Sequence, residues 1–287
     1  MSGERSLLVM IEERIAAGRF ELPARSRVAT ELHRLVSDPE VDLAKVAALI
    51  AGDAALTGEV LRAANGALYA GLSKVATVRE ASVRLGTSQL LRVAVQTCEK
   101  QQYCARSPML KGFMEPLWQH SLGVAHGAAW LARKLGYRDL EQVAFVGGLL
   151  HDVGKLLLIK VIEDVFVDEG LHEDLSERLV LEILESAHTT RGFDLARGWG
   201  LPDEYGLVIR DHHLDDLSQA GTLINLVSLA NKACRRLGIG IDADTSLVLA
   251  VTEEAATLGA GDIVLAQLMV ELEDQLEAGE TAGTAPR

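Results

Sequence analysis

The sequence predicts an all-α protein built as a two-lobed helical bundle, and three observations carry that prediction. Apolar residues return at helical spacing in most segments, as in Leu43, Val46 and Ile50. Residues that favour helix starts, such as Asp42 and Asp53, precede several of these runs. The apolar and polar alternation typical of strands is absent. Aromatic residues are only 4% of the chain, so we expect an aliphatic, helical core.

The helices are predicted as short elements in two groups. The first group is expected at 6–17, 22–35, 43–50, 53–64, 78–85 and 88–95. Thr77 and Thr87 are the predicted N-caps of its last two helices. The second group is expected near 114–135, 139–151, 174–186, 190–198, 203–212 and 221–237. Two more amphipathic segments follow Gly240, and the last of them runs from Ile263 to Leu276.

The polar stretch 99–112 is the predicted connection between the two lobes. We therefore divide the chain into an N-terminal helix, an N-terminal helical lobe, a second helical lobe, C-terminal helices and a disordered tail. Their predicted ranges are 1–18, 19–110, 111–237, 238–278 and 279–287.

Charge and composition exclude several classes of function. The formal net charge of −13 disfavours nucleic-acid binding and attachment to anionic membranes, both of which need a basic surface. Apolar runs such as 143–150 are too short to span a bilayer, and the first residues lack a signal-peptide pattern. The sparse cysteines suit reduced thiols. We expect a cytoplasmic protein.

A candidate metal-ligand pair lies in an otherwise apolar stretch at 149–157. His151 and Asp152 would be costly to bury without partners, and a divalent cation would serve both at once. Gly154 permits a close approach of backbone or ligand. Lys155 either caps the C-terminal end of its helix or contacts a phosphate.

More polar groups lie at or beside apolar helical faces, which is how helical bundles build metal sites. They are His120, His188, His212, His213 and Asn231. His126 lies on a different helical face from His120 and is expected to pack or to be exposed. His33 and His172 stand in polar company and are expected to be solvated.

The order of these motifs resembles the HD-related output domain (HDOD) family, relatives of the HD and HD-GYP metal-dependent phosphohydrolases. In the second lobe the resemblance lies in the motif Glu182…His188…Gly192…Trp199-Gly-Leu-Pro…His212-His213. In the first lobe it lies in the segments beginning Asp53-Ala-Ala-Leu-Thr, Arg62-Ala-Ala-Asn-Gly and Val78-Arg-Glu-Ala-Ser. The resemblance covers roughly residues 20–235, places an HDOD domain at 19–237 and implies a two-lobed, all-helical bacterial signalling domain.

The resemblance also implies a ligand set for one or two ions of iron, manganese or zinc. His120 matches the first histidine of the HD pattern, and His151 and Asp152 match its central pair. His188, His212 and His213 match the extra histidines of two-metal relatives. Asn231 stands where the last aspartate is expected, and a neutral amide is a weaker ligand than a carboxylate. The Gly-Tyr-Pro motif of the relatives that hydrolyse cyclic di-GMP is absent.

The function expected from the resemblance is signal transduction through contacts with a protein partner or a nucleotide, without nucleic acid or membrane. Whether the chain is an enzyme stays open, with a non-enzymatic role favoured. The alternative is a metal-dependent phosphohydrolase of a nucleotide or cyclic dinucleotide, in which Asp152 and Lys155 would be catalytic. A third possibility is a metal that only ties the helices together.

Overall fold

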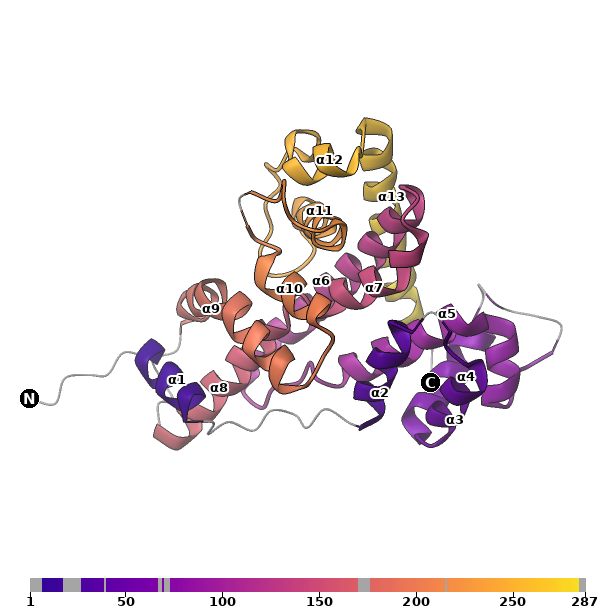
Figure 1. Cartoon of the computed structure of the whole chain (residues 1–287). Coiled ribbons are helices and arrows are strands. Elements are labelled where there is room, and N and C mark those ends of the chain that lie inside the picture. Colours follow the sequence, from indigo (N-terminus) through magenta and orange to yellow (C-terminus); the bar gives the residue numbers. More distant parts are fainter. Residues whose placement is uncertain are drawn as a thin grey trace, which may run out of the picture.

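The computed structural model describes residues 7–17, 27–38, 40–66, 69, 73–169, 176–214 and 216–283. Within these ranges the chain is helical and forms no strand, so the predicted all-α class is confirmed (Figure 1). No helix in this part of the chain combines the length and the apolar character needed to cross a membrane.

The first part of the chain forms five helices, of which the last three begin directly after the predicted capping residues Asp42, Asp53 and Thr77. The five helices are α1 (Leu7–Ala16), α2 (Arg27–Val36), α3 (Leu43–Ala51), α4 (Ala54–Asn65) and α5 (Val78–Lys100). The side chains of Asp42, Asp53 and Thr77 each accept a hydrogen bond from a backbone N–H in the first turn of the helix that follows. The break predicted between 85 and 88 falls at Gly86, whose φ of 74° interrupts α5.

The second half of the chain departs from the prediction in three places, one of which is a helix start at Pro108, inside the connection predicted at 99–112. Its helices are α6 (Pro108–Lys134), α7 (Glu141–Leu150), α8 (Val153–Glu169), α9 (Glu177–Gly198), α10 (Asp203–Asp211), α11 (Thr222–Arg236), α12 (Glu253–Leu258) and α13 (Asp262–Gly283). The sequence analysis missed α8, because this helix is buried on nearly every side and shows no apolar stripe. The segments predicted at 174–186 and 190–198 form one helix, α9.

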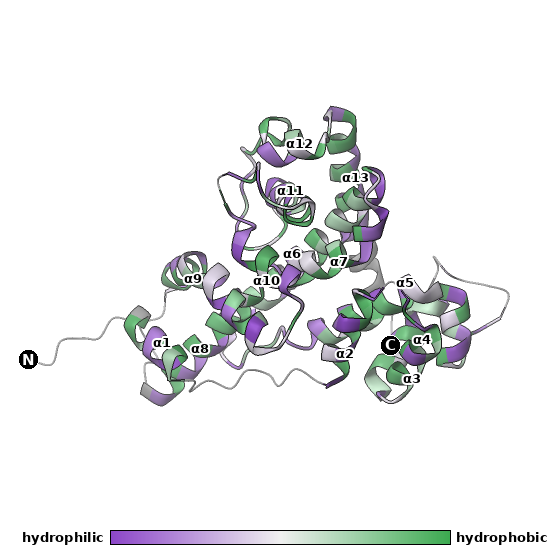
Figure 2. Ribbon diagram, in the orientation of Figure 1, coloured by the Kyte–Doolittle hydropathy of each residue, from purple (hydrophilic) through white to green (hydrophobic). Residues whose placement is uncertain are grey.

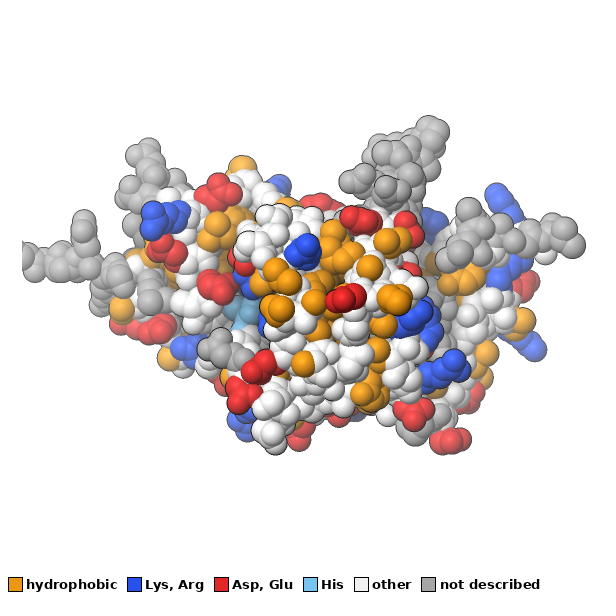
Figure 3. All heavy atoms as spheres, turned by 90° about the horizontal axis from the view of Figure 1, so that it is seen from above, with side chains coloured by type: hydrophobic (Ala, Val, Ile, Leu, Met, Phe, Trp, Pro, Cys, Tyr) orange, Lys and Arg blue, Asp and Glu red, His pale blue; other side chains and the backbone are white. Residues whose placement is uncertain are grey.

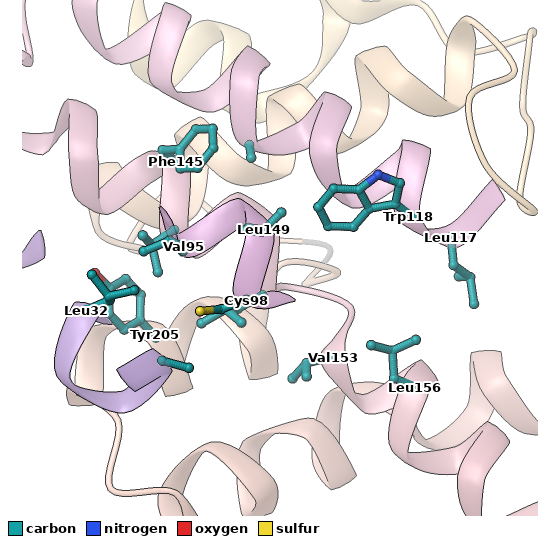
Figure 4. Close-up of a cluster of buried hydrophobic side chains, with 14 of the residues drawn as sticks. Leu32, Val95, Cys98, Leu117, Trp118, Phe145, Leu149, Val153, Leu156 and Tyr205 are labelled. Atoms are coloured by element: carbon teal, nitrogen blue, oxygen red, sulfur yellow. The ribbon is translucent and has the colours of Figure 1, made fainter. Parts of the chain in front are cut away.

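The two lobes share one apolar core. Figure 4 shows side chains from α2, α5, α6, α7, α8 and α10 in a single buried cluster. Among them are Leu32, Cys98, Trp118, Phe145 and Tyr205. Figure 2 shows the same arrangement as hydrophobic helix faces turned toward their neighbours. Burial of this shared surface fixes the first lobe against the second.

Within the described residues, helix α1 does not pack with the rest of the first predicted group of helices. It packs on α8, where Arg14 forms an ion pair with Asp168, and lies far from α3 and α4 (Figure 1). At the other end of the chain, α11, α12 and α13 form a second apolar cluster with α6. Helix α13 continues to Gly283, so the prediction of a disordered tail from 279 is wrong as far as 283, and 284–287 lie outside the described residues.

Glycines let the helices that carry the histidines cross closely. A Cβ at Gly148 on α7 would lie 2.7 Å from the Cα of Ala125 on α6. A Cβ at Gly154 on α8 would lie 1.9 Å from the carbonyl oxygen of His188 on α9. The close approach predicted for Gly154 is therefore one of backbone to backbone, between α8 and α9.

Replacement of Gly154 by alanine should destabilise the protein, because the added methyl group overlaps the α9 backbone. We expect a loss of about 1–3 kcal/mol in the free energy of unfolding. The matched control is Gly58→Ala on α4, where a Cβ meets nothing within 4 Å and better helix propensity should stabilise by about 0.5–1 kcal/mol. Urea denaturation measures both. Equal stability of the two variants would contradict the contact.

Candidate metal centre

Six predicted ligand residues converge on one point between four helices. His120 comes from the middle of α6, while His151 and Asp152 follow the last residue of α7. His188 lies on α9, and His212 and His213 follow the end of α10. Their candidate ligand atoms form two groups that share Asp152, one with His120 and His151 and the other with His188, His212 and His213. The fold thus brings together residues that are 93 positions apart at the extremes, from 120 to 213.

One oxygen of the Asp152 carboxylate faces the first group. Its Oδ2 lies 3.3 Å from His151 Nε2 and 3.7 Å from His120 Nε2. The two Nε2 atoms are 3.3 Å apart. The other oxygen, Oδ1, faces the second group, 3.4 Å from His188 Nε2 and 3.6 Å from His212 Nε2. Asp152 is therefore shared by the two groups of candidate ligands and could contribute one oxygen to each.

Backbone carbonyls fix the orientation of four of the imidazoles. His120 Nδ1 donates to Ile239 O at 2.9 Å, and His151 Nδ1 donates to Gly148 O at 2.7 Å. His188 Nδ1 donates to Leu184 O at 2.8 Å, and His212 Nδ1 donates to Ile209 O at 3.0 Å. A carbonyl oxygen only accepts, so each Nδ1 carries the proton and each Nε2 presents a lone pair. Ligating histidines are commonly held in this way.

The arrangement fits a cation better than any internal hydrogen-bond network. Lone pairs on Nε2 and carboxylate oxygens face one another, which is repulsive until a positive ion lies between them. Asp152 Oδ1 and the Nε2 atoms of His188, His212 and His213 have no hydrogen-bond partner in the described structure. Two ligand atoms each about 2.0–2.1 Å from a tetrahedral ion are about 3.3–3.4 Å apart, close to the separations found here.

Burial favours the neutral state of four of the imidazoles, which is the state that binds a metal. Burial lowers the pKa of His120 to about 3, of His188 to about 4 and of His213 to about 2, and neighbouring charged groups modify each value. It lowers the pKa of His212 as well. For Asp152 burial acts in the opposite direction, yet Lys155 and His151 hold the pKa of its carboxyl well below the usual range. Figure 3 accordingly shows little histidine on the face seen from above.

Lys155 lies at the centre and does not cap the C-terminal end of a helix. It lies in the first turn of α8, so its predicted role at a helix C-terminus is wrong. Its buried Nζ donates to Asp152 Oδ2 at 2.8 Å. This ammonium partly offsets the carboxylate charge next to the first group of ligands.

Asn231 lines a narrow recess at the edge of the centre, together with His120, Lys155 and His213. The recess is too narrow to admit a water molecule. Two further residues that line it, Arg235 and Asp242, were missed by the sequence analysis. The spacing of Asn231 and Arg235, one helical turn apart on α11, could have indicated that both face the same site.

The remaining histidines lie outside the centre. The predicted solvation of His33 is wrong: its ring is fully buried and its Nε2 lies 2.9 Å from Glu99 Oε1, joining α2 to α5. His126 packs edge-on against Phe145, as one of the two expected outcomes for this residue. His172 lies outside the described residues.

Comparisons with known proteins identify the family of this chain. Residues 22–214 match the HDOD domain. An uncharacterised protein of Treponema pallidum (strain Nichols) is 26% identical over 227 residues, which are 76% of this chain and 43% of that protein. The chain therefore spans less than half the length of this curated relative.

Solved structures share the fold. An HDOD domain protein of unknown function from Geobacter sulfurreducens is 24% identical, with a TM-score of 0.73 over 94% of this chain and 95% of that one. A candidate signal transduction protein from Marinobacter aquaeolei VT8 is 21% identical, with a TM-score of 0.70 over 98% of this chain and 67% of that one. At these identities the likeness establishes the fold alone.

Fold and site together define the class: an all-helical domain with a histidine-rich cluster of candidate metal ligands around one aspartate. With the match over 22–214, the chain belongs to the HDOD family.

Replacement of His151 by alanine should remove bound metal, because this histidine supplies one of the three candidate ligands of the first group. The matched control is His126→Ala, a histidine on α6 outside the centre. Elemental analysis of tag-free protein should find iron, manganese or zinc in the wild type and the control, and less in His151→Ala. Equal metal in all three proteins would contradict the assignment.

Replacement of Asn231 by aspartate should strengthen metal binding, because a charged carboxylate replaces a neutral amide at the edge of the centre. We expect the affinity for a divalent ion to rise by about tenfold. Titration calorimetry measures it. An unchanged affinity would mean that Asn231 does not act on the metal.

Proposed function

We propose that this chain is a metal-binding regulatory domain of a bacterial, cytoplasmic signalling pathway, acting through contacts with a protein partner or a nucleotide. The observation that carries this proposal is a nearly complete ligand set beneath a closed recess. The candidate ligands His120, His151, Asp152, His188, His212 and His213 converge, and the recess that the described residues form beside them is too narrow for a water molecule. Such a site is suited to holding an ion and responding to it.

The position of the centre supports a structural role for the ion. Ligands come from α6, α9, and the ends of α7 and α10, so one bound ion would restrain several helices at once. An ion that binds only the folded chain stabilises it in proportion to its affinity and concentration. Occupancy would then be read by a partner as a difference in rigidity or surface geometry. The candidate signal transduction protein of M. aquaeolei has the same fold, which supports this assignment by analogy.

A second candidate function is hydrolysis of a phosphoester, and the recess favours it. Lys155 and Arg235 bring two cations to the edge of the ligand cluster, and they could bind the oxygens of a phosphate if the recess opened. A divalent ion held by the cluster would supply Lewis-acid chemistry. The residues of this chain would orient the phosphate and exclude water. Asn231 in place of an aspartate weakens this candidate relative to the first.

Chelation should lower the melting temperature of the metal-loaded protein, because the ion stabilises the folded state alone. At an ion concentration near one hundred times the dissociation constant, the loss corresponds to about 5–10 °C. Differential scanning calorimetry before and after chelator measures it, and His151→Ala, which keeps only the second group of candidate ligands intact, should respond less. An unchanged melting temperature of the loaded wild type would contradict a role of the metal in restraining the helices.

Purified, metal-loaded protein should not hydrolyse bis(p-nitrophenyl) phosphate or nucleoside monophosphates above the rate of free metal. We expect no hydrolysis because the closed recess would keep these substrates away from the metal. Metal-dependent turnover that is lost in His151→Ala would establish the phosphohydrolase and overturn the regulatory assignment. The assay uses the same protein preparations as the metal analysis, so activity and occupancy are compared directly.

A further inference from the structure

The segment after α11, Gly238–Asp244, covers the metal centre. The Ile239 carbonyl accepts the hydrogen bond from His120 Nδ1 at 2.9 Å. Gly240 has a φ of +111°, and a Cβ there would lie 2.9 Å from the Cβ of His120. Ile241 and Asp242 line the recess. This segment, which we call the cover, therefore lies directly against a predicted ligand.

Arg235 holds the cover in place. Its Nε lies 3.2 Å from Asp242 Oδ2 and donates to the Asp242 carbonyl at 3.1 Å. The Asp244 N–H donates to the Arg235 carbonyl at 2.9 Å. The side chains of Arg235 and Asp242 are 23% and 38% exposed, and an ion pair this accessible to water is weak. The contact is therefore easily exchanged for another.

The charges in the recess are arranged as two pairs. Lys155 is paired with Asp152, and Arg235 is paired with Asp242. The Asp152 carboxylate also faces the histidine ligands, whereas Asp242 lies on the cover and faces none of the candidate ligand groups. Asp242 thus supplies a carboxylate to a guanidinium that lines the site. An external phosphate would suit the same guanidinium better, since its oxygens match the fork of donors and carry more charge.

We propose that Arg235 is an anion-binding residue of the metal centre, that its ligand is a phosphate-bearing molecule, and that Asp242 is an internal competitor which keeps the cover closed. This inference rests on the proposed metal-binding function. Binding of a phosphate at Arg235 would release Asp242 and open the recess from 238 to 244. The occupied and empty states would then differ in the surface formed by the cover, which gives a partner something to recognise.

The test uses inorganic phosphate as the probe and the metal-loaded chain of 287 residues. Asp242→Asn keeps the size of the side chain and removes its charge, so phosphate affinity by titration calorimetry should rise at least about fivefold. The matched control, Asp216→Asn, removes an equal charge from an exposed turn where the side chain bonds only Ser218 among the described residues, and should change little. The double variant Arg235→Gln/Asp242→Asn should lose the gain.

Hydrogen exchange provides a readout that needs no metal. The amides of Ile239 and Asp244 are bonded to the carbonyls of Cys234 and Arg235, and both should exchange faster in Asp242→Asn than in the control, with or without metal. If neither the exchange rates nor the phosphate affinity changed in Asp242→Asn, the proposal that Asp242 keeps the cover closed would be wrong. If the double variant kept the higher phosphate affinity, Arg235 would not be the residue that binds the phosphate. Absence of metal from the wild type, by contrast, would contradict the proposed function. The exchange measurement would still decide whether Asp242 keeps the cover closed.

Discussion

The architecture of this chain depends on the buried carboxylate of Asp152. It is 2% exposed, and it is surrounded by Lys155 on one side and by imidazole nitrogens that present lone pairs. A carboxylate removed from water in this way is costly unless positive charge lies next to it. One ammonium is present in the chain itself, and the orientation of the histidines leaves room for ions to supply the rest. The four helices that carry these groups must therefore be held at fixed distances.

Small residues provide those distances. Gly148 lets α7 approach the backbone of α6, which brings His151 to within 3.3 Å of His120. Gly154 lets α8 meet α9 near His188. The buried core shared by both lobes then makes these crossings rigid, since side chains packed at this density resist small displacements. A change in the occupancy of the centre would for the same reason be felt in several helices.

The C-terminal region is part of the centre as well as of the core. The Ile239 carbonyl orients His120, and Ser228 Oγ on α11 lies within hydrogen-bond distance of the His212 carbonyl, at 3.0 Å, and of Glu254 Oε1 on α12, at 2.7 Å. The match to the HDOD domain ends at residue 214, before these groups. Residues beyond the matched region therefore help to position the ligands of the centre.

The sequence by itself determined the helical class, most helix starts, the family and the set of metal-ligand candidates. Helix caps such as Asp42 and Asp53 act through neighbours two or three residues away, and the histidines are recognisable by type and order, so both are local signals. The sequence missed α8, whose uniform burial leaves no periodic stripe, and it misjudged His33 and Lys155. Only the tertiary structure decided that His33 is buried against Glu99, that Lys155 pairs with Asp152, and that Arg235 and Asp242 close the recess. Each of these depends on contacts between separate elements, and the charge, size and polarity of a residue do not specify which distant group it will meet.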